Sequence, residues 1–206
     1  VLAWGNNASG QLGNGAAPTD RHTPVPVVGL GSGSGVVQIV AGAATSYARR
    51  SNGTVLAWGN DGVGELGNGL PRIDQSTPVQ VQTLTGVVDI SAGDQHALAL
   101  ERTGAVFAWG DNLLGQLGDG TTKHRSAPVP VLGLGVFSGV RAVYAGGNSS
   151  HTLATSSPPP SPTTPQSGSG GTPGTTPSSS GVSTGGAPLP TTPRARATVA
   201  NPTATG

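Results

Sequence analysis

An internal repeat constrains this chain more than any other feature of its sequence. The triplet Ala-Trp-Gly occurs three times, with tryptophans 54 and 51 residues apart at Trp4, Trp58 and Trp109. A glycine-rich block begins seven residues after each tryptophan, and a Pro-Val pair and an Ala-Gly pair follow it in every copy. Self-similarity at a period of about 50 residues is typical of repeat architectures, whose units are stabilised by their neighbours.

Each copy contains short segments typical of β-strands. In the middle copy, residues 55–58 are apolar and follow the turn glycine Gly53, and residues 79–82 alternate between apolar and polar. Residues 87–90 and 96–100 complete a set of four. Four short strands per copy indicate a propeller blade. We therefore predict an all-β fold over residues 1–155, a partial β-propeller of about three four-stranded blades.

The composition changes abruptly after Thr155. Residues 156–206 are almost entirely Pro, Ser, Thr, Gly and Ala, with no aromatic residue. Such a segment cannot bury enough apolar surface to offset its chain entropy. We predict a disordered Pro/Ser/Thr/Gly-rich tail that serves as a linker or stalk. A stalk of this kind favours a secreted or cell-surface location.

Composition also excludes several classes of function. The chain has no cysteine, which rules out a disulfide framework and any thiolate metal site. Its net charge of +1 gives no sign of a nucleic-acid partner, and it has no apolar run of the roughly 18 residues that span a membrane. The sequence starts inside a motif, at Val1, so we expect it to be part of a longer array. Three blades alone would leave open sheet edges. Further blades of the same chain, or self-association with another copy, would be needed to close the ring.

Two segments resemble a known repeat. Residues 104–120 read Gly-Ala-Val-Phe-Ala-Trp-Gly-Asp-Asn-Leu-Leu-Gly-Gln-Leu-Gly-Asp-Gly, and residues 92–100 read Ala-Gly-Asp-Gln-His-Ala-Leu-Ala-Leu. Both resemble the motifs of the regulator-of-chromosome-condensation repeat family, and the resemblance extends from Val1 to about Ala154. It implies a propeller, usually of seven four-stranded blades, and we expect a bacterial member. The first copy departs from the motif, because Thr45 replaces its histidine.

Residues that recur at one place in every copy are better explained by packing than by ligand binding. We therefore assign structural roles to the repeat residues Trp4, Trp58, Trp109, Gly13, Gly67, Gly118, His96 and His151. The carboxylates Asp61, Glu65, Asp111 and Asp119 interchange with amides between copies, which favours turn capping over acid–base catalysis or a Ca²⁺ site. We predict no catalytic residue, no metal and no cofactor.

The loops that lead from the glycine-rich blocks to the Pro-Val pairs change between copies, while the flanking blocks do not. Variable loops in a fixed frame are common recognition sites. The candidate partner-binding residues in these loops are Asp20, Arg21, His22, Arg72, Asp74, Lys123, His124 and Arg125. We predict a non-catalytic scaffold that binds another protein through loops on one propeller face. The alternatives are a lyase or hydrolase with a site in the propeller channel and, from the family resemblance only, a nucleotide-exchange factor for a GTPase.

Overall fold

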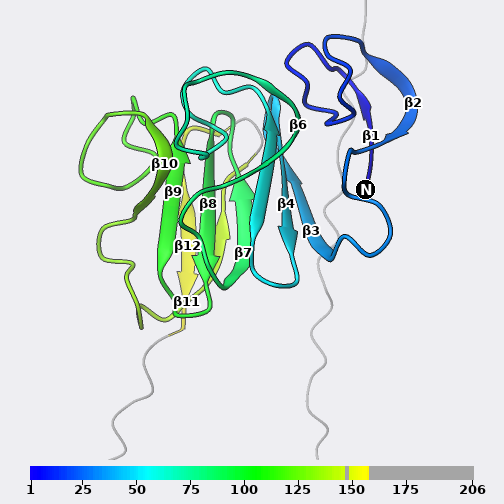
Figure 1. The fold of residues 1–206 in the computed structure, drawn as a ribbon. Coiled ribbons are helices and arrows are strands. Elements are labelled where there is room, and N and C mark those ends of the chain that lie inside the picture. Colours follow the sequence, from blue (N-terminus) through cyan, green and yellow to red (C-terminus); the bar gives the residue numbers. More distant parts are fainter. Residues whose placement is uncertain (147–148, 158–206) are drawn as a thin grey trace, which may run out of the picture. The chain divides into compact units, whose positions relative to one another are not determined.

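The computed structural model describes residues 1–146 and 149–157 (Figure 1). The predicted tail lies outside these residues except for Ser156 and Ser157, so its disorder stays a prediction. The described part consists of β-strands joined by turns and loops, which confirms the all-β class. It includes no helix that could cross a membrane.

Twelve strands follow one another along the described chain. The first six are β1 (Leu2–Gly5), β2 (Arg21–Pro26), β3 (Val36–Ala41), β4 (Thr45–Arg50), β5 (Val55–Gly59) and β6 (Gln75–Gln80). The last six are β7 (Val87–Ala92), β8 (His96–Glu101), β9 (Val106–Gly110), β10 (Arg125–Pro130), β11 (Val140–Tyr144) and β12 (Leu153–Ser156).

The strands form antiparallel sheets that do not coincide with the sequence copies. The two complete blades have the strand orders β3-β4-β5-β6 and β7-β8-β9-β10, while β1-β2 and β11-β12 are two-stranded. Each complete blade takes two strands from one copy and two from the next. The twelve strands therefore amount to the predicted three blades, divided into two whole blades and a half blade at each end.

The apolar core lies between neighbouring blades. One cluster joins Tyr47 of β4 and Val55 of β5 to Ile90 of β7 and Trp109 of β9. A second joins Leu98 of β8 to residues of β11. Each blade alone would expose one face of this core to water, so burial of apolar surface stabilises neighbouring blades together.

Each buried tryptophan is held by the copy before its own. The indole Nε1 of Trp58 donates to the backbone oxygen of Gln11 at 2.9 Å, and that of Trp109 donates to the oxygen of Glu65 at 2.8 Å. The glycine two residues further on must lack a side chain, because a Cβ at Gly67 would lie 2.7 Å from the Trp109 ring. We call this carbonyl oxygen and glycine a tryptophan socket.

The three sockets are not all filled. Trp58 occupies the socket at Gln11 and Gly13, and Trp109 occupies the one at Glu65 and Gly67. The third is formed by Gln116 and Gly118, and no described residue donates an indole to it. Trp4, at the same repeat position as the other two, is 63% exposed. Its half blade supplies no preceding copy for it to pack against.

Replacing Trp109 tests the socket. We expect Trp109→Ala to lower the free energy of unfolding by about 3–5 kcal/mol, since a fully buried aromatic side chain is lost and a cavity remains. The variant Trp109→Phe keeps one aromatic ring but loses the indole N–H and part of the ring volume, so its loss should be smaller than that of the alanine variant. Urea denaturation at neutral pH measures both. Equal stability of the alanine variant and the wild type would contradict the role of the socket.

Candidate functional site

The long loops gather at one end of the blades. Because neighbouring strands are antiparallel, the loops between β1 and β2, β5 and β6, and β9 and β10 leave the sheets at the same end (Figure 1). We call this the loop end, made of residues 6–20, 60–74 and 111–124. All eight predicted partner-binding residues lie in these loops or at the first residues of the strands that follow them.

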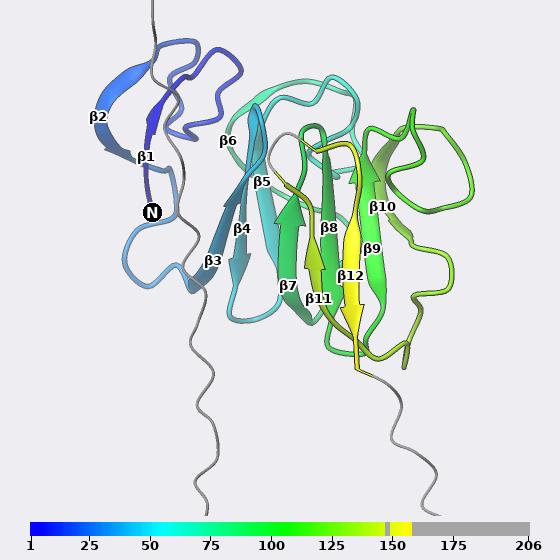
Figure 2. The same cartoon turned by 180° about the vertical axis from the view of Figure 1, so that it is seen from behind.

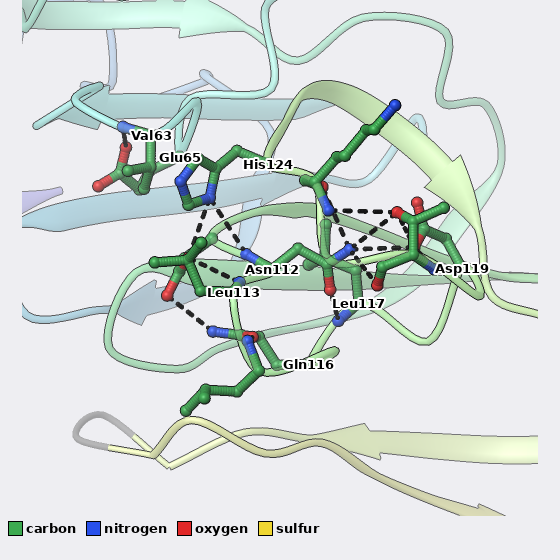
Figure 3. Close-up of polar contacts among 12 residues, drawn as sticks. Val63, Glu65, Asn112, Leu113, Gln116, Leu117, Asp119 and His124 are labelled. Atoms are coloured by element: carbon green, nitrogen blue, oxygen red, sulfur yellow. Dashed lines mark hydrogen bonds and ion pairs between the residues drawn. The ribbon is translucent and has the colours of Figure 1, made fainter.

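A buried amide holds the first and third loops. Asn112 is fully buried; its Oδ1 accepts from the Leu117 N–H at 3.0 Å, and its Nδ2 donates to the backbone oxygens of Thr121 and Lys123 at 3.0 and 3.1 Å (Figure 3). Asn7 makes the corresponding bonds in the first loop. One side chain thus fixes the backbone of the whole loop.

Asp61 replaces this amide in the second loop. Its Oδ1 still accepts from the Leu66 N–H at 3.1 Å, but its Oδ2 is buried with no hydrogen-bond partner in the described part of the chain. A carboxylate cannot donate as the Asn112 amide does, unless it is protonated. Burial raises the pKa of Asp61, which favours that protonated form.

A second acidic residue of the middle copy, Glu65, stands where the other copies have an amide. Gln116 donates through Nε2 to Asp111 at 2.8 Å, whereas the Glu65 carboxyl, at the same position of the middle copy, accepts from the Val63 N–H at 2.8 Å and has no amide group to donate (Figure 3). Glu65 is 1% exposed, and burial, with a smaller contribution from neighbouring carboxylates, raises its pKa to about 7. Acid and amide occupy the same turn position, as the sequence suggests, but they are not equivalent there.

Three of the predicted partner-binding residues are engaged within their own loops. Asp20 accepts from the Asn7 N–H and Asp74 from the Asp61 N–H, both at 2.9 Å. The Nδ1 atom of His124 lies 3.3 Å from the Asn112 nitrogen in the same arrangement (Figure 3). These side chains tie the end of each loop to its beginning.

A fourth predicted partner-binding residue, Arg125, is also engaged within its own loop. Its guanidinium pairs with Asp119, with an Nη2–Oδ2 distance of 2.6 Å. Burial alone would raise the pKa of Asp119, but hydrogen bonds from Thr121, Arg125 and Asn112 outweigh it and lower the pKa to about 2. The positive charge of Arg125 is therefore compensated inside the loop.

The remaining predicted residues face solvent to different extents. Arg21 is partly buried, whereas His22, Arg72 and Lys123 are exposed. In the described part of the chain, the side chains of Arg72 and Lys123 make no hydrogen bond or ion pair. Gly69 donates its N–H to the Ser126 oxygen at 2.7 Å, so the second loop borders the segment that carries Lys123.

Sequence reasoning missed the exposed apolar residues of the loop end. Their exposed fractions are 57% for Leu70, 62% for Ile73, 65% for Leu113 and 75% for Leu114. A comparison of the copies would have found two of them, because Leu113 and Leu114 stand where the first copy has Ala8 and Ser9. Exposed apolar side chains bordered by polar residues are typical of protein-binding surfaces.

The two histidines at the repeat position differ in their exposure to solvent. His96 is buried, its Nε2 lies 3.1 Å from Thr152 Oγ1 in the next half blade, and burial lowers its pKa. His151, at the corresponding position, is exposed. The residues that the structure describes include no group of three or more His, Cys, Asp or Glu side chains arranged to hold a metal ion.

Each complete blade takes strands from two copies, and each buried tryptophan packs into the copy before its own. These two features define a propeller built from sequence repeats. Residues 1–48, 52–100 and 103–154 match the regulator of chromosome condensation (RCC1) repeat, and a second model of that repeat matches residues 36–65 and 87–116. The chain belongs to the RCC1 repeat family.

Known relatives extend well beyond this chain. It is 35% identical over 157 residues to the ultraviolet-B receptor UVR8 of Arabidopsis thaliana, which covers 75% of the chain and 34% of the receptor. Human WBSCR16 matches its fold with a TM-score of 0.62 at 26% identity, over 76% of the chain and 40% of that structure. Yeast RCC1 (Prp20), solved bound to Kap60, matches with a TM-score of 0.59 at 29% identity, over 74% and 36%.

The chain thus spans about a third or less of the curated relatives that it matches first. These relatives are human and plant proteins, which give no support to the expected bacterial source.

Glu65 should make the stability of the chain depend on pH. Its pKa is about 7 in the folded state against an ordinary value of 4.5, so the folded state binds more protons between these values. The contribution of Glu65 to the free energy of unfolding is therefore highest below pH 4.5, and it falls as the pH rises to about 7. Glu65→Gln should remove this fall. Above pH 7, its free energy of unfolding should exceed that of the wild type by up to about 3 kcal/mol.

Urea denaturation between pH 4 and pH 8 measures this difference. The mirror variant Gln116→Glu should introduce a similar fall, because it places a carboxylate beside Asp111. Parallel pH profiles for the wild type and Glu65→Gln would show that Glu65 is not held in its protonated form.

Proposed function

We propose that this chain is a non-catalytic scaffold that binds another protein at its loop end. The observation that carries the proposal is a set of four exposed side chains at the loop end, Leu70, Arg72, Ile73 and Lys123. Two are apolar and two are cations without an ion pair among the described residues, and they project from loops that border one another. Arginine is enriched in protein–protein interfaces and among the residues that contribute most to binding, and exposed apolar side chains bordered by polar ones mark interaction surfaces.

The loop frame supports this role physically. Buried side chains at positions 7, 61 and 112 bind the loop backbones, and Asp20, Asp74 and His124 close the loops. A loop that is already fixed loses little conformational entropy on binding, so more of the contact energy appears as affinity. The frame recurs in each copy, with Asp61 in place of the amide in the second loop, while the projecting side chains differ.

Two further points favour a protein partner. Yeast RCC1 (Prp20), which has the same repeat fold, has been solved in complex with the protein Kap60. The described residues of this chain offer no specific observation in favour of the two alternatives, a channel enzyme or nucleotide exchange on a GTPase. A secreted or cell-surface location remains a prediction.

The test compares two sets of variants of the full 206-residue chain. Arg72→Ala, Ile73→Ala and Lys123→Ala together remove the proposed contacts without touching the groups that hold the loops. Arg125 is left intact, because its loss would leave Asp119 unpaired and disturb the third loop. The matched control carries Arg102→Ala and Val136→Ala, two exposed residues in the turns at the opposite end of the blades.

Proteins retained by the immobilised wild type are identified, and the affinity of the leading partner is then measured for each variant. We expect the loop-end variant to weaken binding at least tenfold, which corresponds to about 1.4 kcal/mol, and the control to bind as the wild type does. Unchanged affinity of the loop-end variant, or a loss in the control, would contradict the proposed surface.

A further inference from the structure

The second loop lacks a hydrogen-bond donor that holds the first and third loops. In the first loop, the amide nitrogen of Asn7 donates to two backbone oxygens, nine and twelve residues further on, at 2.7 and 3.2 Å. The first and second loops are each closed by an aspartate 13 residues after this position, so their lengths agree. Asp61 takes the place of Asn7, and the residues nine and twelve positions after it are Leu70 and Ile73. A carboxyl oxygen therefore stands where the other loops have an amide nitrogen that faces backbone oxygens.

A proton on Asp61 would replace the missing donor. Its Oδ2 atom is buried without a hydrogen-bond partner in the described part of the chain. A carboxylate only accepts hydrogen bonds, whereas a protonated carboxyl group carries an O–H that can donate to a backbone oxygen, as the Asn7 amide does. The Ile73 oxygen already accepts from the Gln75 amide at 3.1 Å, which favours the Leu70 oxygen as the acceptor.

Glu65 repeats this substitution near the start of the loop. Its counterparts Gln116 and Gln11 each donate from the amide nitrogen to the residue five positions earlier, at 2.8 and 2.6 Å. Five positions before Glu65 is Asn60, whose Oδ1 accepts from the Gly62 N–H at 3.1 Å. Only a protonated Glu65 can donate to this oxygen. The second loop thus has two acids at places where its neighbours have amide donors.

Burial is the largest cause that raises the pKa of both acids. The pKa of Glu65 rises to about 7, to which the charges of Asp61 and Asp74 add. Backbone N–H groups and the charge of Arg72 lower the pKa of Asp61, but it stays raised overall. The other charged or titratable side chains on the elements packed against this loop are Tyr47 of β4, which donates to the Glu65 backbone oxygen, and Arg125 of β10, which is paired with Asp119 and preceded by His124.

The second loop has a neighbouring loop on each side (Figure 2). The Gly15 N–H of the first loop donates to the Ser76 oxygen at the end of the second loop at 2.9 Å, and the Gly69 N–H of the second loop donates to the Ser126 oxygen at 2.7 Å. These contacts join backbone groups, which do not titrate. The two acids are therefore what distinguishes the second loop from its neighbours.

We propose that Asp61 and Glu65 form a proton-dependent latch that controls partner binding at the loop end. With both acids protonated, the loop is held as its neighbours are, and Leu70, Arg72 and Ile73 are fixed in place for the partner. Transfer of the protons to water removes both donors, leaves two negative charges in the loop and releases the segment 70–73. The inference rests on the proposed function for the binding residues and adds their regulation by pH.

Proton linkage sets the direction of the effect. The held loop keeps both acids buried with raised pKa values, whereas release returns them to water and to their ordinary values of 3.8 and 4.5. The held form therefore binds more protons from these values up to about pH 7, and a rise in pH favours release. The apparent affinity for the partner falls with the fraction of chains in the held form. Binding should be tightest in mildly acidic solution and weaker above pH 7.

The first test measures the loop without any partner. Hydrogen exchange of the full chain at pH 5.5 and pH 8, corrected for the intrinsic exchange rates, gives the protection of amides in the segment 69–74. We expect this protection to fall at least about tenfold between the two pH values. The segment 15–20 of the first loop, which Asn7 holds, should keep its protection. Amides of β8 report global unfolding and should stay protected at both pH values.

Two sets of variants assign the effect to the acids. Asp61→Asn combined with Glu65→Gln supplies the amides that the other copies have, so the second loop should stay protected at pH 8. The mirror variant Asn7→Asp places an acid in the first loop, where protection should then fall as the pH rises. Added Ca²⁺ is the control for a bound cation and should not restore protection to the wild type at pH 8.

The second test measures the affinity of the partner retained in the pulldown. The wild type should bind at least about tenfold more tightly at pH 5.5 than at pH 8, because fewer chains hold the loop at the higher pH. The double variant Asp61→Asn with Glu65→Gln should bind at pH 8 as tightly as the wild type does at pH 5.5.

Four results would overturn the latch. They are a second loop whose protection does not change with pH, a change that the double variant retains, protection restored by Ca²⁺ at pH 8, and a partner affinity that depends on Arg72 and Ile73 but not on pH. The proposed function fails separately, if the loop responds to pH as expected while the loop-end substitutions leave partner binding unchanged.

Discussion

The rest of the structure depends on the contact between a tryptophan and the backbone of the copy before it. The indole of Trp109 reaches across to the Glu65 oxygen, and Gly67 leaves room for its ring. Tyr47 donates to the same oxygen at 2.8 Å and packs edge-on against the indole, with ring centroids 6.1 Å apart. Residues from three copies thus meet at one carbonyl group. No blade can complete its core without a neighbour, and stability is therefore a property of the array.

The glycine-rich block that contains the socket residues also orients the loops. Leu117 follows the socket residue Gln116, and its N–H donates to Asn112, whose amide in turn holds the third loop. Core packing and loop geometry are joined in three consecutive residues, Gln116, Leu117 and Gly118. Substitutions in the projecting part of a loop, such as residues 70–73, can therefore change the surface without changing the frame. This separation explains how copies with one backbone can present different side chains to a partner.

The sequence predicts the strands and the core role of Trp58 and Trp109, because their period and apolar character are local properties. It does not predict that blades exchange strands between copies, since a repeat has no inherent starting point and only sheet pairing defines the blade. The variation of these loops between copies suggested that Asp20 and His124 contact a partner. Their hydrogen bonds to backbone N–H groups depend on distances that only the folded loop sets. The sequence does not predict the exposure of Leu70 and Ile73, because the direction of a side chain within a loop depends on the folded backbone.

The middle copy shows why agreement with a motif does not measure stability. It keeps the tryptophan, the glycines and the histidine, yet it alone places carboxyl groups where the others have amides, at Asp61 and Glu65. Both are buried, and Glu65 also supplies the carbonyl oxygen that holds Trp109 and Tyr47. Ionisation of Glu65 would therefore place a buried negative charge on the residue whose backbone oxygen holds both aromatic side chains. The sockets of Gln11 and Gln116 contain no such group, so a fit to the motif at the middle copy comes with a stability that falls as the pH rises.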